Sequence, residues 1–214
     1  MAKKESTFIN MVVALFIVTL VAAGTLGGVY EATKEPIAKA KLEKKLNAIK
    51  AVVPEFTNNP NADKYEIPVE NGDPIIAYPA NSSNELVGTA LETYTMAGFS
   101  GLIKLMVGLN TDGSINNISV LEHKETPGLG THMSDDWFIA QFKGKNPGTN
   151  NIKVTKDQGE IDAITAATIS SRAFSDAVQR AYDSYKSYKP KTEITVADTT
   201  LNEQNQGGED ESVN

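Results

Sequence analysis

The residues best suited to chemistry lie together in the segment DAITAATISS, residues 162–171. The segment begins with an acid and holds three alanines and four hydroxyl side chains, which are Thr165, Thr168, Ser170 and Ser171. Apolar residues at helical spacing follow it, so the hydroxyls stand at the start of a predicted helix. The unpaired N–H groups and the dipole at a helix start favour a phosphate, to which a threonine hydroxyl can be esterified.

Helix capping is the simpler interpretation of the same hydroxyls. Serine and threonine are preferred N-cap residues, but one cap needs only one hydroxyl. Capping does not account for Ala166 and Ala167, whose small side chains leave room for a large group against the backbone. The residues therefore leave two interpretations open, a capped helix start and the attachment site of a phosphate-bearing group.

A second candidate segment is ETPGLG, residues 125–130. Pro127 restricts one turn, and Gly128 and Gly130 permit positive φ, so the backbone can approach a flat or charged ligand closely. A tight turn without any ligand has the same composition.

Trp137 is predicted to be a core aromatic, and His123 and His132 to be structural or exposed rather than metal ligands.

Strands come before helices in the part of the chain that must position these segments. Alternating apolar residues at 103–109 and 115–120, separated by NTDG, predict a hairpin, and PIIAY and ELVGTALET are strand-like. A helix is expected around MSDDWFIAQF, and another carries Phe174, Val178, Ala181 and Tyr185 on one face. Without a regular βαβ alternation, this order predicts an α+β fold, with an antiparallel sheet and flanking helices.

The N-terminal segment predicts a membrane anchor. Residues 8–30 carry no charge and would extend roughly 34 Å as a helix, enough to span a bilayer as one transmembrane helix. A cleaved signal peptide is the alternative, although its apolar region is normally shorter. We expect residues 1–7 to be a cytoplasmic N-terminus, 31–55 an amphipathic connecting helix ending at Pro54, 56–189 the folded domain, and 190–214 an acidic disordered tail.

Charge and cysteine content exclude several classes of protein. The net charge is −7, and six acids and one lysine give residues 190–214 a net charge of −5, so the rest carries −2 and no basic field attracts nucleic acid. The chain has no cysteine, which excludes disulfides, thiolate zinc sites and cysteine-ligated iron–sulfur clusters. An organic cofactor is therefore the expected carrier for any redox chemistry.

DAITAAT, residues 162–168, resembles the flavinylation motif of FMN-binding domains. In that motif an acid is followed by a hydroxyl, a small residue, alanine and a threonine that carries FMN through a phosphoester bond. The resemblance places covalent FMN on Thr168, and Ala166 stands where the family most often has glycine. ETPGLG looks like a second hallmark of the family and GFSG, residues 98–101, like a third.

The resemblance also implies roles for the other motif residues. Asp162 would position the hydroxyl or a metal during flavin transfer, or simply cap the backbone, and Thr165 would bond the phosphate or cap the turn. The ring or ribityl chain would be lined from the upstream loop, with Leu129 packed on the ring, and Trp137 would lie near the flavin if it is not in the core. The implied cofactor-binding set is Asp162, Thr165, Ala166, Ala167, Thr168, Ser171, Glu125, Thr126, Pro127, Gly128, Leu129 and Gly130, without a catalytic residue or a metal ligand.

The order of these motifs after one membrane span is similar to the order in the G subunits of Rnf electron-transport complexes. It is also similar to that in the C subunits of sodium-translocating NADH:quinone reductases, but the compact layout favours the former. The resemblance implies an electron-carrier subunit without substrate turnover of its own, in a complex that couples electron flow between ferredoxin and NAD to Na⁺ or H⁺ movement. A domain with noncovalent FMN and a cofactor-free interaction domain are the alternatives.

The membrane sidedness has two opposing indications. Lys3 and Lys4 precede the span, whereas five lysines follow it between residues 34 and 45, so the positive-inside rule alone favours a cytoplasmic C-terminus. The family resemblance instead implies a single-pass protein of the bacterial cytoplasmic membrane. Its soluble domain would lie outside the cytoplasm, where a flavin transferase attaches FMN from FAD, and its partners would be other membrane subunits. We follow the resemblance, because attachment requires that enzyme's compartment.

Overall fold

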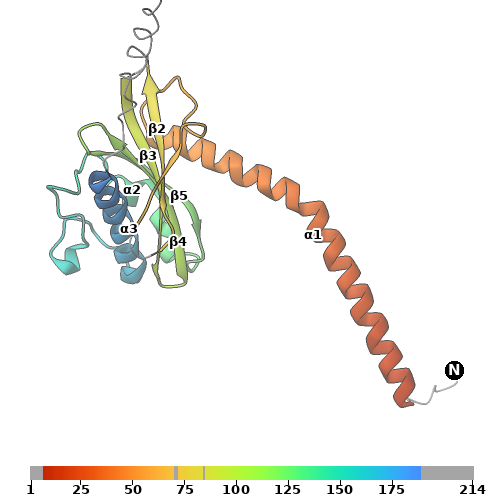
Figure 1. Ribbon diagram of the computed structural model, residues 1–214. Helices are drawn as coiled ribbons and strands as arrows, with labels where there is room; N and C mark the ends of the chain where they lie inside the picture. The colour runs from red at the N-terminus through yellow and green to blue at the C-terminus, as the bar shows by residue number, and fades with distance from the viewer. Residues whose placement is uncertain (1–6, 70–71, 84, 189–214) are drawn as a thin grey trace, which may run out of the picture.

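The computed structural model describes residues 7–69, 72–83 and 85–188 of the 214-residue chain. A five-stranded antiparallel sheet carries helices on both faces, and one long N-terminal helix projects from it (Figure 1). The fold is therefore α+β, with an antiparallel sheet and flanking helices, as the sequence predicted. The predicted acidic tail, residues 190–214, and most of the predicted cytoplasmic N-terminus lie outside the described residues.

The sheet is a meander in which each strand pairs with the next one along the chain. Its strands are β1 (Tyr65–Ile67), β2 (Ile75–Ser82), β3 (Glu85–Gly98), β4 (Gly101–Asn110) and β5 (Ile115–His123). The predicted hairpin is β4–β5, in which Leu109 pairs with Ile115 and Gly113 turns the chain with φ of 83°. The other two predicted strands are β2 and β3, and β3 extends to the GFSG turn.

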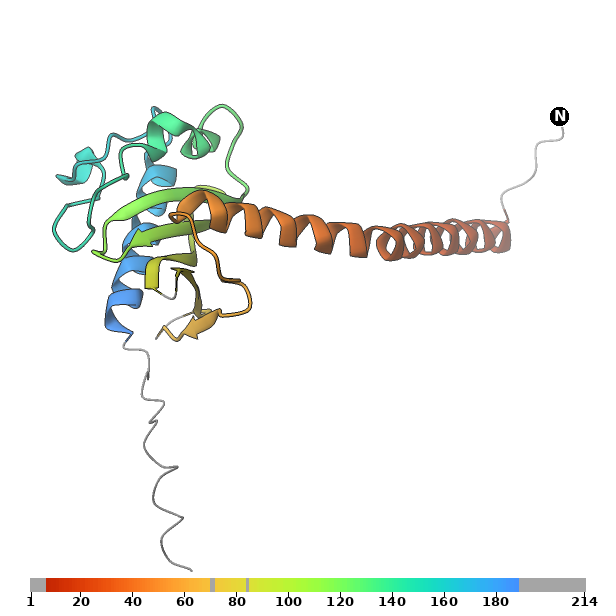
Figure 2. The ribbon, with the colours of Figure 1, turned by 90° about the horizontal axis from the view of Figure 1, so that it is seen from above.

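Helix α3 (Thr168–Ser187) covers one face of the sheet. Alternate residues of β4, such as Leu105 and Val107, are buried against α3 together with Phe174 and Val178. Figure 2 shows the strands lying between blue α3 and the orange end of the N-terminal helix. The period-2 pattern of β4 and the helical pattern of α3 thus meet in one core.

The helix predicted around residues 133–142 is present, but it is shorter than the segment. The structure has a 3₁₀ turn, η1 (Gly130–Ser134), and a four-residue helix, α2 (Asp136–Ile139). Asp135 between them is extended, with φ of −78° and ψ of 143°, which stops helical hydrogen bonding. Phe138 and Phe142 nevertheless reach the core and pack edge-to-face 5.6 Å apart.

The opposite face of the sheet holds the end of helix α1 (Phe8–Val52). Ile49 and Val52 are buried there against Met106 and Tyr78. The side-chain amides of Asn116 and Asn117 in β5 donate to the carbonyls of Val52 and Ala51, at 2.8 and 2.9 Å. These bonds satisfy carbonyls that a helix end leaves without partners, so the helix end is fixed to the sheet.

A polar contact adds to the attachment of α1. The ammonium group of Lys45 lies 2.9 Å from the carboxylate of Glu92, which also accepts a 2.9 Å hydrogen bond from the hydroxyl of Tyr78. Burial and this carboxylate both raise the pKa of Tyr78. A helix residue, a strand carboxylate and a buried tyrosine are therefore linked across the sheet face.

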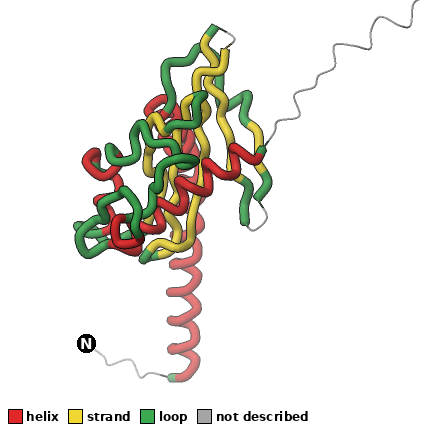
Figure 3. Tube along the Cα trace, turned by 90° about the vertical axis from the view of Figure 1, so that its left-hand side faces the viewer, coloured by secondary structure: helices red, strands yellow, loops and turns green. Residues whose placement is uncertain are grey.

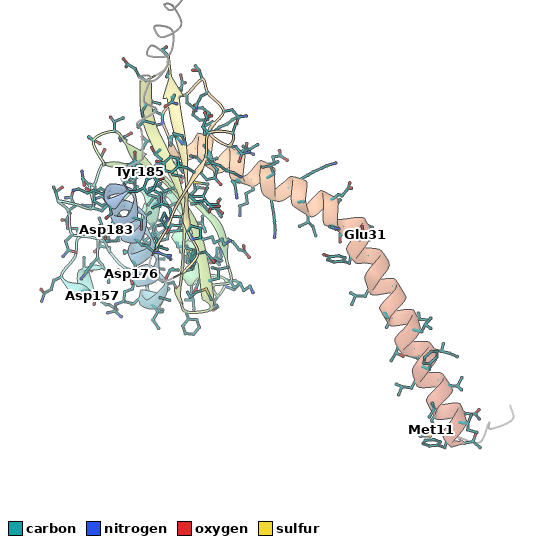
Figure 4. All side chains as sticks on the ribbon, viewed as in Figure 1. Met11, Glu31, Asp157, Asp176, Asp183 and Tyr185 are labelled. Carbon is teal, nitrogen blue, oxygen red and sulfur yellow. The ribbon has the colours of Figure 1, made fainter. Side chains whose placement is uncertain are left out.

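The predicted transmembrane and connecting helices form one 45-residue helix, which ends at Val52, two residues before Pro54. It is the one described helix that is long and apolar enough to cross a membrane. The helix changes direction near Glu31 (Figure 4), one turn before Pro36. Proline has no N–H to donate to the preceding turn and its ring crowds that turn, which accounts for the bend.

Gly108→Ala tests the contact between α1 and the sheet. A Cβ at this position of β4 would overlap the backbone carbonyl of Val52, so the last turn of α1 would have to move. We expect the free energy of unfolding to fall by roughly 1–3 kcal/mol, measured by urea denaturation of the chain in detergent. Gly27→Ala is the control, because nothing lies within 4 Å of its Cβ position. Equal stability of Gly108→Ala and wild type would contradict the contact.

Candidate functional site

Three segments distant in sequence meet at the start of α3. They are the turn between β3 and β4, the loop after β5, and the residues that lead into α3. Figure 3 shows the long loops between β5 and α3, in green, gathered to the left of the strands. GFSG, ETPGLG and DAITAAT, which stand apart in the sequence, therefore contribute to one site.

Glu125 joins the three segments through a buried carboxylate. The residue is only 4% exposed. One carboxylate oxygen accepts a 3.0 Å hydrogen bond from the N–H of Ser100, and the other accepts a 2.7 Å bond from the hydroxyl of Ser170. No cation forms an ion pair with this carboxylate within the described residues. Its two donors satisfy it instead.

Two glycines make room for this carboxylate. A Cβ on Gly98 would lie 2.7 Å from one oxygen of Glu125, and a Cβ on Gly130 would lie 2.6 Å from the other. At Gly130 the added carbon would also lie 2.7 Å from the hydroxyl oxygen of Ser170. These glycines are therefore required for close packing around the carboxylate. Gly128, with φ of 75°, is the one that supplies the left-handed turn in its loop.

A cavity of about 260 Å³ opens beside this contact. Its apolar side chains are partly exposed: Phe99 is 67%, Leu129 40% and Ile169 48% accessible. Backbone and small residues at the start of α3 form the rest. The lining residues are Phe99, Glu125, Thr126, Leu129, Gly130, Ala166, Ala167, Thr168, Ile169 and Ser170. A flat apolar group suits such walls, and a polar group suits the helix start.

Thr168 is the first residue of α3 and lies at the cavity with a half-exposed side chain. Its hydroxyl oxygen accepts a 3.0 Å hydrogen bond from the ammonium group of Lys156. The two serine hydroxyls of the segment are already engaged, because Ser170 bonds Glu125 and Ser171 is buried. The hydroxyl of Ser171 donates to the carbonyl of Ala167 and accepts from the N–H of Ile164.

The capping interpretation is wrong for all four hydroxyls. Ala167 occupies the N-cap position, with φ of −130° and ψ of 42°, and provides no side-chain hydrogen bond. Thr165 lies before the cap, and the other three hydroxyls lie inside the helix. The start of α3 therefore lacks a side-chain cap, and residues of its first turn line the cavity.

Ala166 has a left-handed backbone, with φ of 60°. This conformation costs an alanine roughly 1–2 kcal/mol relative to the right-handed one, whereas glycine adopts it freely. Ala166 stands where the sequence resemblance expects glycine, and the left-handed turn explains why glycine suits this position of the cavity lining. Ala166 keeps the turn and stores the strain at the site.

Several residues predicted for the site lie outside the cavity lining. Within ETPGLG, Pro127 and Gly128 form the exposed outer turn, whereas Glu125, Thr126, Leu129 and Gly130 line the cavity. Of the DAITAAT residues, Asp162 and Thr165 are exposed and do not line it. Asp162 is held through its backbone, which exchanges two hydrogen bonds with the amide of Gln141. Their roles toward a cofactor stay predictions.

The prediction of a core position for Trp137 is wrong. It is 52% exposed rather than in the core, and its ring nitrogen donates to Asp135 at 3.2 Å. Its neighbour Phe138 takes the core position, because adjacent residues of a helix point about 100° apart. Both histidines bond to nearby residues: His123 accepts from the N–H of Glu125, and His132 pairs with Asp135.

Sequence reasoning missed Phe99, Ile169, Ser170 and Lys156 as members of the site. Phe99 sits in the GFSG turn, and an aromatic residue between two glycines was the available signal. Ser170 was considered as a cap or as one of the hydroxyls near an attachment site, but not as a partner of Glu125. Nothing in the spacing of Lys156 connects it with Thr168, because the turn that carries it folds back on α3.

Comparison with known proteins finds one domain family and several relatives that share the same name. The FMN-binding domain family matches residues 98–183. The chain is 33% identical over 192 residues to the G subunit of the ion-translocating oxidoreductase complex of Aliivibrio fischeri, covering 84% of this chain and 90% of that protein. The G subunit of the same complex in Methanosarcina acetivorans is 32% identical over 183 residues, covering 84% and 94%. A solved structure of the C subunit of the Na⁺-translocating NADH-quinone reductase from Parabacteroides distasonis matches with a TM-score of 0.44 and 22% identity, over 69% of this chain and 81% of that one.

Replacement of Glu125 separates its hydrogen bonds from its charge. In Glu125→Ala the N–H of Ser100 and the hydroxyl of Ser170 lose their acceptor, and we expect the free energy of unfolding to fall by roughly 2–4 kcal/mol. In Glu125→Gln the amide oxygen can accept from Ser100 and the amide N–H can donate to Ser170, so the loss should stay below about 1 kcal/mol. Urea denaturation measures both, and equal losses would contradict this account.

Proposed function

The chain belongs to the family of G subunits of ion-translocating oxidoreductase complexes, and we propose on this basis that it is a membrane-anchored electron carrier holding FMN at the start of α3. The observation that carries the proposal is the hydroxyl of Thr168 at the edge of an apolar cavity. Family and geometry thus support the same cofactor from independent directions. Membership among the related C subunits of quinone reductases has no observation in its favour beyond the shared domain.

The residues at the site fit a flavin nucleotide. Phe99, Leu129 and Ile169 offer apolar surface for a flat ring, and the uncapped start of α3 offers N–H groups for a phosphate. The cavity of about 260 Å³ is somewhat smaller than the roughly 300–1,000 Å³ typical of small-molecule pockets. This size supports a flavin that is partly buried, with an edge left at the surface.

Bound FMN supplies a ring that accepts and releases one or two electrons. The chain's own task is to orient that ring on apolar side chains and to keep one side accessible. We propose that electrons come from and go to neighbouring membrane subunits, with no substrate turned over here. Coupling of ferredoxin and NAD chemistry to Na⁺ or H⁺ movement would then belong to the assembled complex.

We further propose that the flavin is attached covalently, through a phosphoester to Thr168. Ser170 and Ser171 are buried and engaged, and Thr165 does not line the cavity, so Thr168 is the hydroxyl best placed for attachment. A flavin transferase would perform the attachment. Because the carboxylate of Asp162 is exposed and the residue is held through its backbone, we propose that Asp162 acts within the complex with that transferase.

Thr168→Ala should abolish covalent flavin. The full chain is co-produced with a flavin transferase, and the intact mass in denaturant is expected to rise by one FMN less one water in wild type only. Thr165→Ala is the matched control and should retain the modification, with peptide mapping placing it on Thr168. An unmodified wild type, with the transferase active on a control protein, would contradict covalent attachment. A coloured but unmodified protein would indicate noncovalent FMN.

The long helix supports a place in the membrane. Every residue in the uncharged part of α1 is exposed, and the side chains of Phe16 and Leu20 are 65% and 59% accessible, so lipid or other subunits must cover this segment. We propose a single span of the cytoplasmic membrane with the FMN domain outside the cytoplasm. The lysines after the span argue for the reverse orientation by the positive-inside rule, which is a statistical tendency.

Because the chain has no cysteine, a single introduced one reports the sidedness. Lys143 is exposed on the domain, and we expect Lys143→Cys to react with a membrane-impermeant maleimide in intact spheroplasts. Lys4→Cys, at the other end of the span, is the control and should react only after lysis. Reaction of Lys143→Cys only after lysis would place the domain in the cytoplasm and contradict the proposed orientation.

A further inference from the structure

Lys156 contacts the proposed attachment residue, although it does not line the cavity. Its ammonium group donates a 3.0 Å hydrogen bond to the hydroxyl oxygen of Thr168, and its side chain is exposed. We propose that Lys156 is a positioning residue for flavin attachment: it holds the hydroxyl oxygen before transfer and neutralises the phosphodiester afterwards. The inference rests on the proposed function, because it assumes that Thr168 is the attachment residue.

The electrostatics at this place favour an anion beside Lys156. A helix start carries a partial positive charge, so a cation there is unfavourable and an acid favourable. The first turn of α3 nevertheless has no acidic residue, and Lys156 lies over its first residue. An anion held between the ammonium group and the helix start attracts both of them, so it offsets the unfavourable interaction between the two.

The backbone around Lys156 is fixed against α3. Lys156 lies in the short 3₁₀ turn η2 (Thr155–Asp157). The carboxylate of Asp157 makes two 2.7 Å hydrogen bonds with the guanidinium of Arg172, in the second turn of α3, which hold the pKa of Asp157 below its usual range. Figure 4 labels Asp157 beside α3. The lysine side chain is long and flexible, but the backbone of Lys156 that carries it is thus held in a defined position.

The other side of this turn is closed as well. Gln158 ends it in a left-handed conformation, with φ of 61°. A Cβ on Gly159 would overlap the backbone of Lys153, and Val154 and Ile161 form a bridge beneath. The residues on either side of the turn therefore pack against each other. Truncation of the Lys156 side chain leaves these contacts in place.

The transfer step shows what Lys156 contributes. The oxygen of Thr168 forms a bond to the flavin-side phosphorus of a flavin dinucleotide, and the P–O–P bond breaks so that AMP leaves with the bridging oxygen. The hydroxyl proton is released to the transferase or to solvent. The product diester keeps one negative charge. An ammonium group already on the attacking oxygen stabilises the charge that develops there without moving.

Lys153 is the matched control for this proposal. It is also exposed and lies three residues earlier, where it interacts electrostatically with Asp157 and Asp176, whereas the hydrogen bond to Thr168 comes from Lys156. Both lysines carry the same charge near the start of α3. A comparison of the two separates the specific contact from the general positive field.

The experiment measures attachment directly. The full chain, purified in detergent without flavin, is incubated with a flavin transferase and FAD, and intact mass follows the modified fraction over time. We expect Lys156→Met to slow the modification about tenfold, less than a buried donor would because the site is exposed to solvent and salt. Lys156→Arg should recover most of the rate, and Lys153→Met should match wild type. Higher ionic strength should narrow the gap between wild type and Lys156→Met.

The outcomes separate the inference from the function on which it rests. A wild type that is never modified would overturn the proposed covalent attachment itself. A modified wild type with Lys156→Met equally fast, or with Lys153→Met equally slow, would overturn the role of Lys156 alone. Urea denaturation of each variant controls for folding, and the expected midpoints equal that of wild type.

Discussion

The buried carboxylate of Glu125 accepts hydrogen bonds from two segments that lie 25 and 45 residues away along the chain. A carboxylate without a cation needs such donors in a buried place, and each donor brings its own segment with it. The β3–β4 turn contributes an N–H, α3 contributes a hydroxyl, and two glycines leave the space. The cavity lies beside this contact, so the same hydrogen bonds hold together the segments that line it.

The sheet relates this site to the membrane anchor. Strand β4 buries alternate residues against α3, while Met106 and Gly108 face the end of α1. The two asparagines of β5 hold the last carbonyls of that helix. A displacement of α1 on one face of the sheet should therefore shift β4, the strand that supports α3 on the opposite face, because close-packed interiors transmit strain.

Patterns with a strong period were predictable from the sequence. Alternation identified the β4–β5 hairpin and helical spacing identified α3, because both are set by burial of every second or every third to fourth residue. DAITAAT and ETPGLG were found from their hydroxyls and glycines, and GFSG was found through the family resemblance. The contact of Lys156 with Thr168 and the exposure of Trp137 depend on how short irregular segments fold back, which no local period encodes. The uncapped start of α3 belongs to the same class, since a serine inside a first turn and a serine cap have the same sequence signature.

Helix α1 runs without a break in hydrogen-bonded structure from the apolar segment into the fold, apart from the bend before Pro36. Residues 31–47 stand between the uncharged segment and the first buried residue, Ala48, a rise of about 25 Å. In a continuous helix one residue advances the chain by about 1.5 Å but turns it by about 100°. The number of residues in this segment therefore sets the rotation of the domain about the helix axis. Loss of a single residue would leave the domain at nearly the same distance from the uncharged segment but would point its cavity toward a different neighbour.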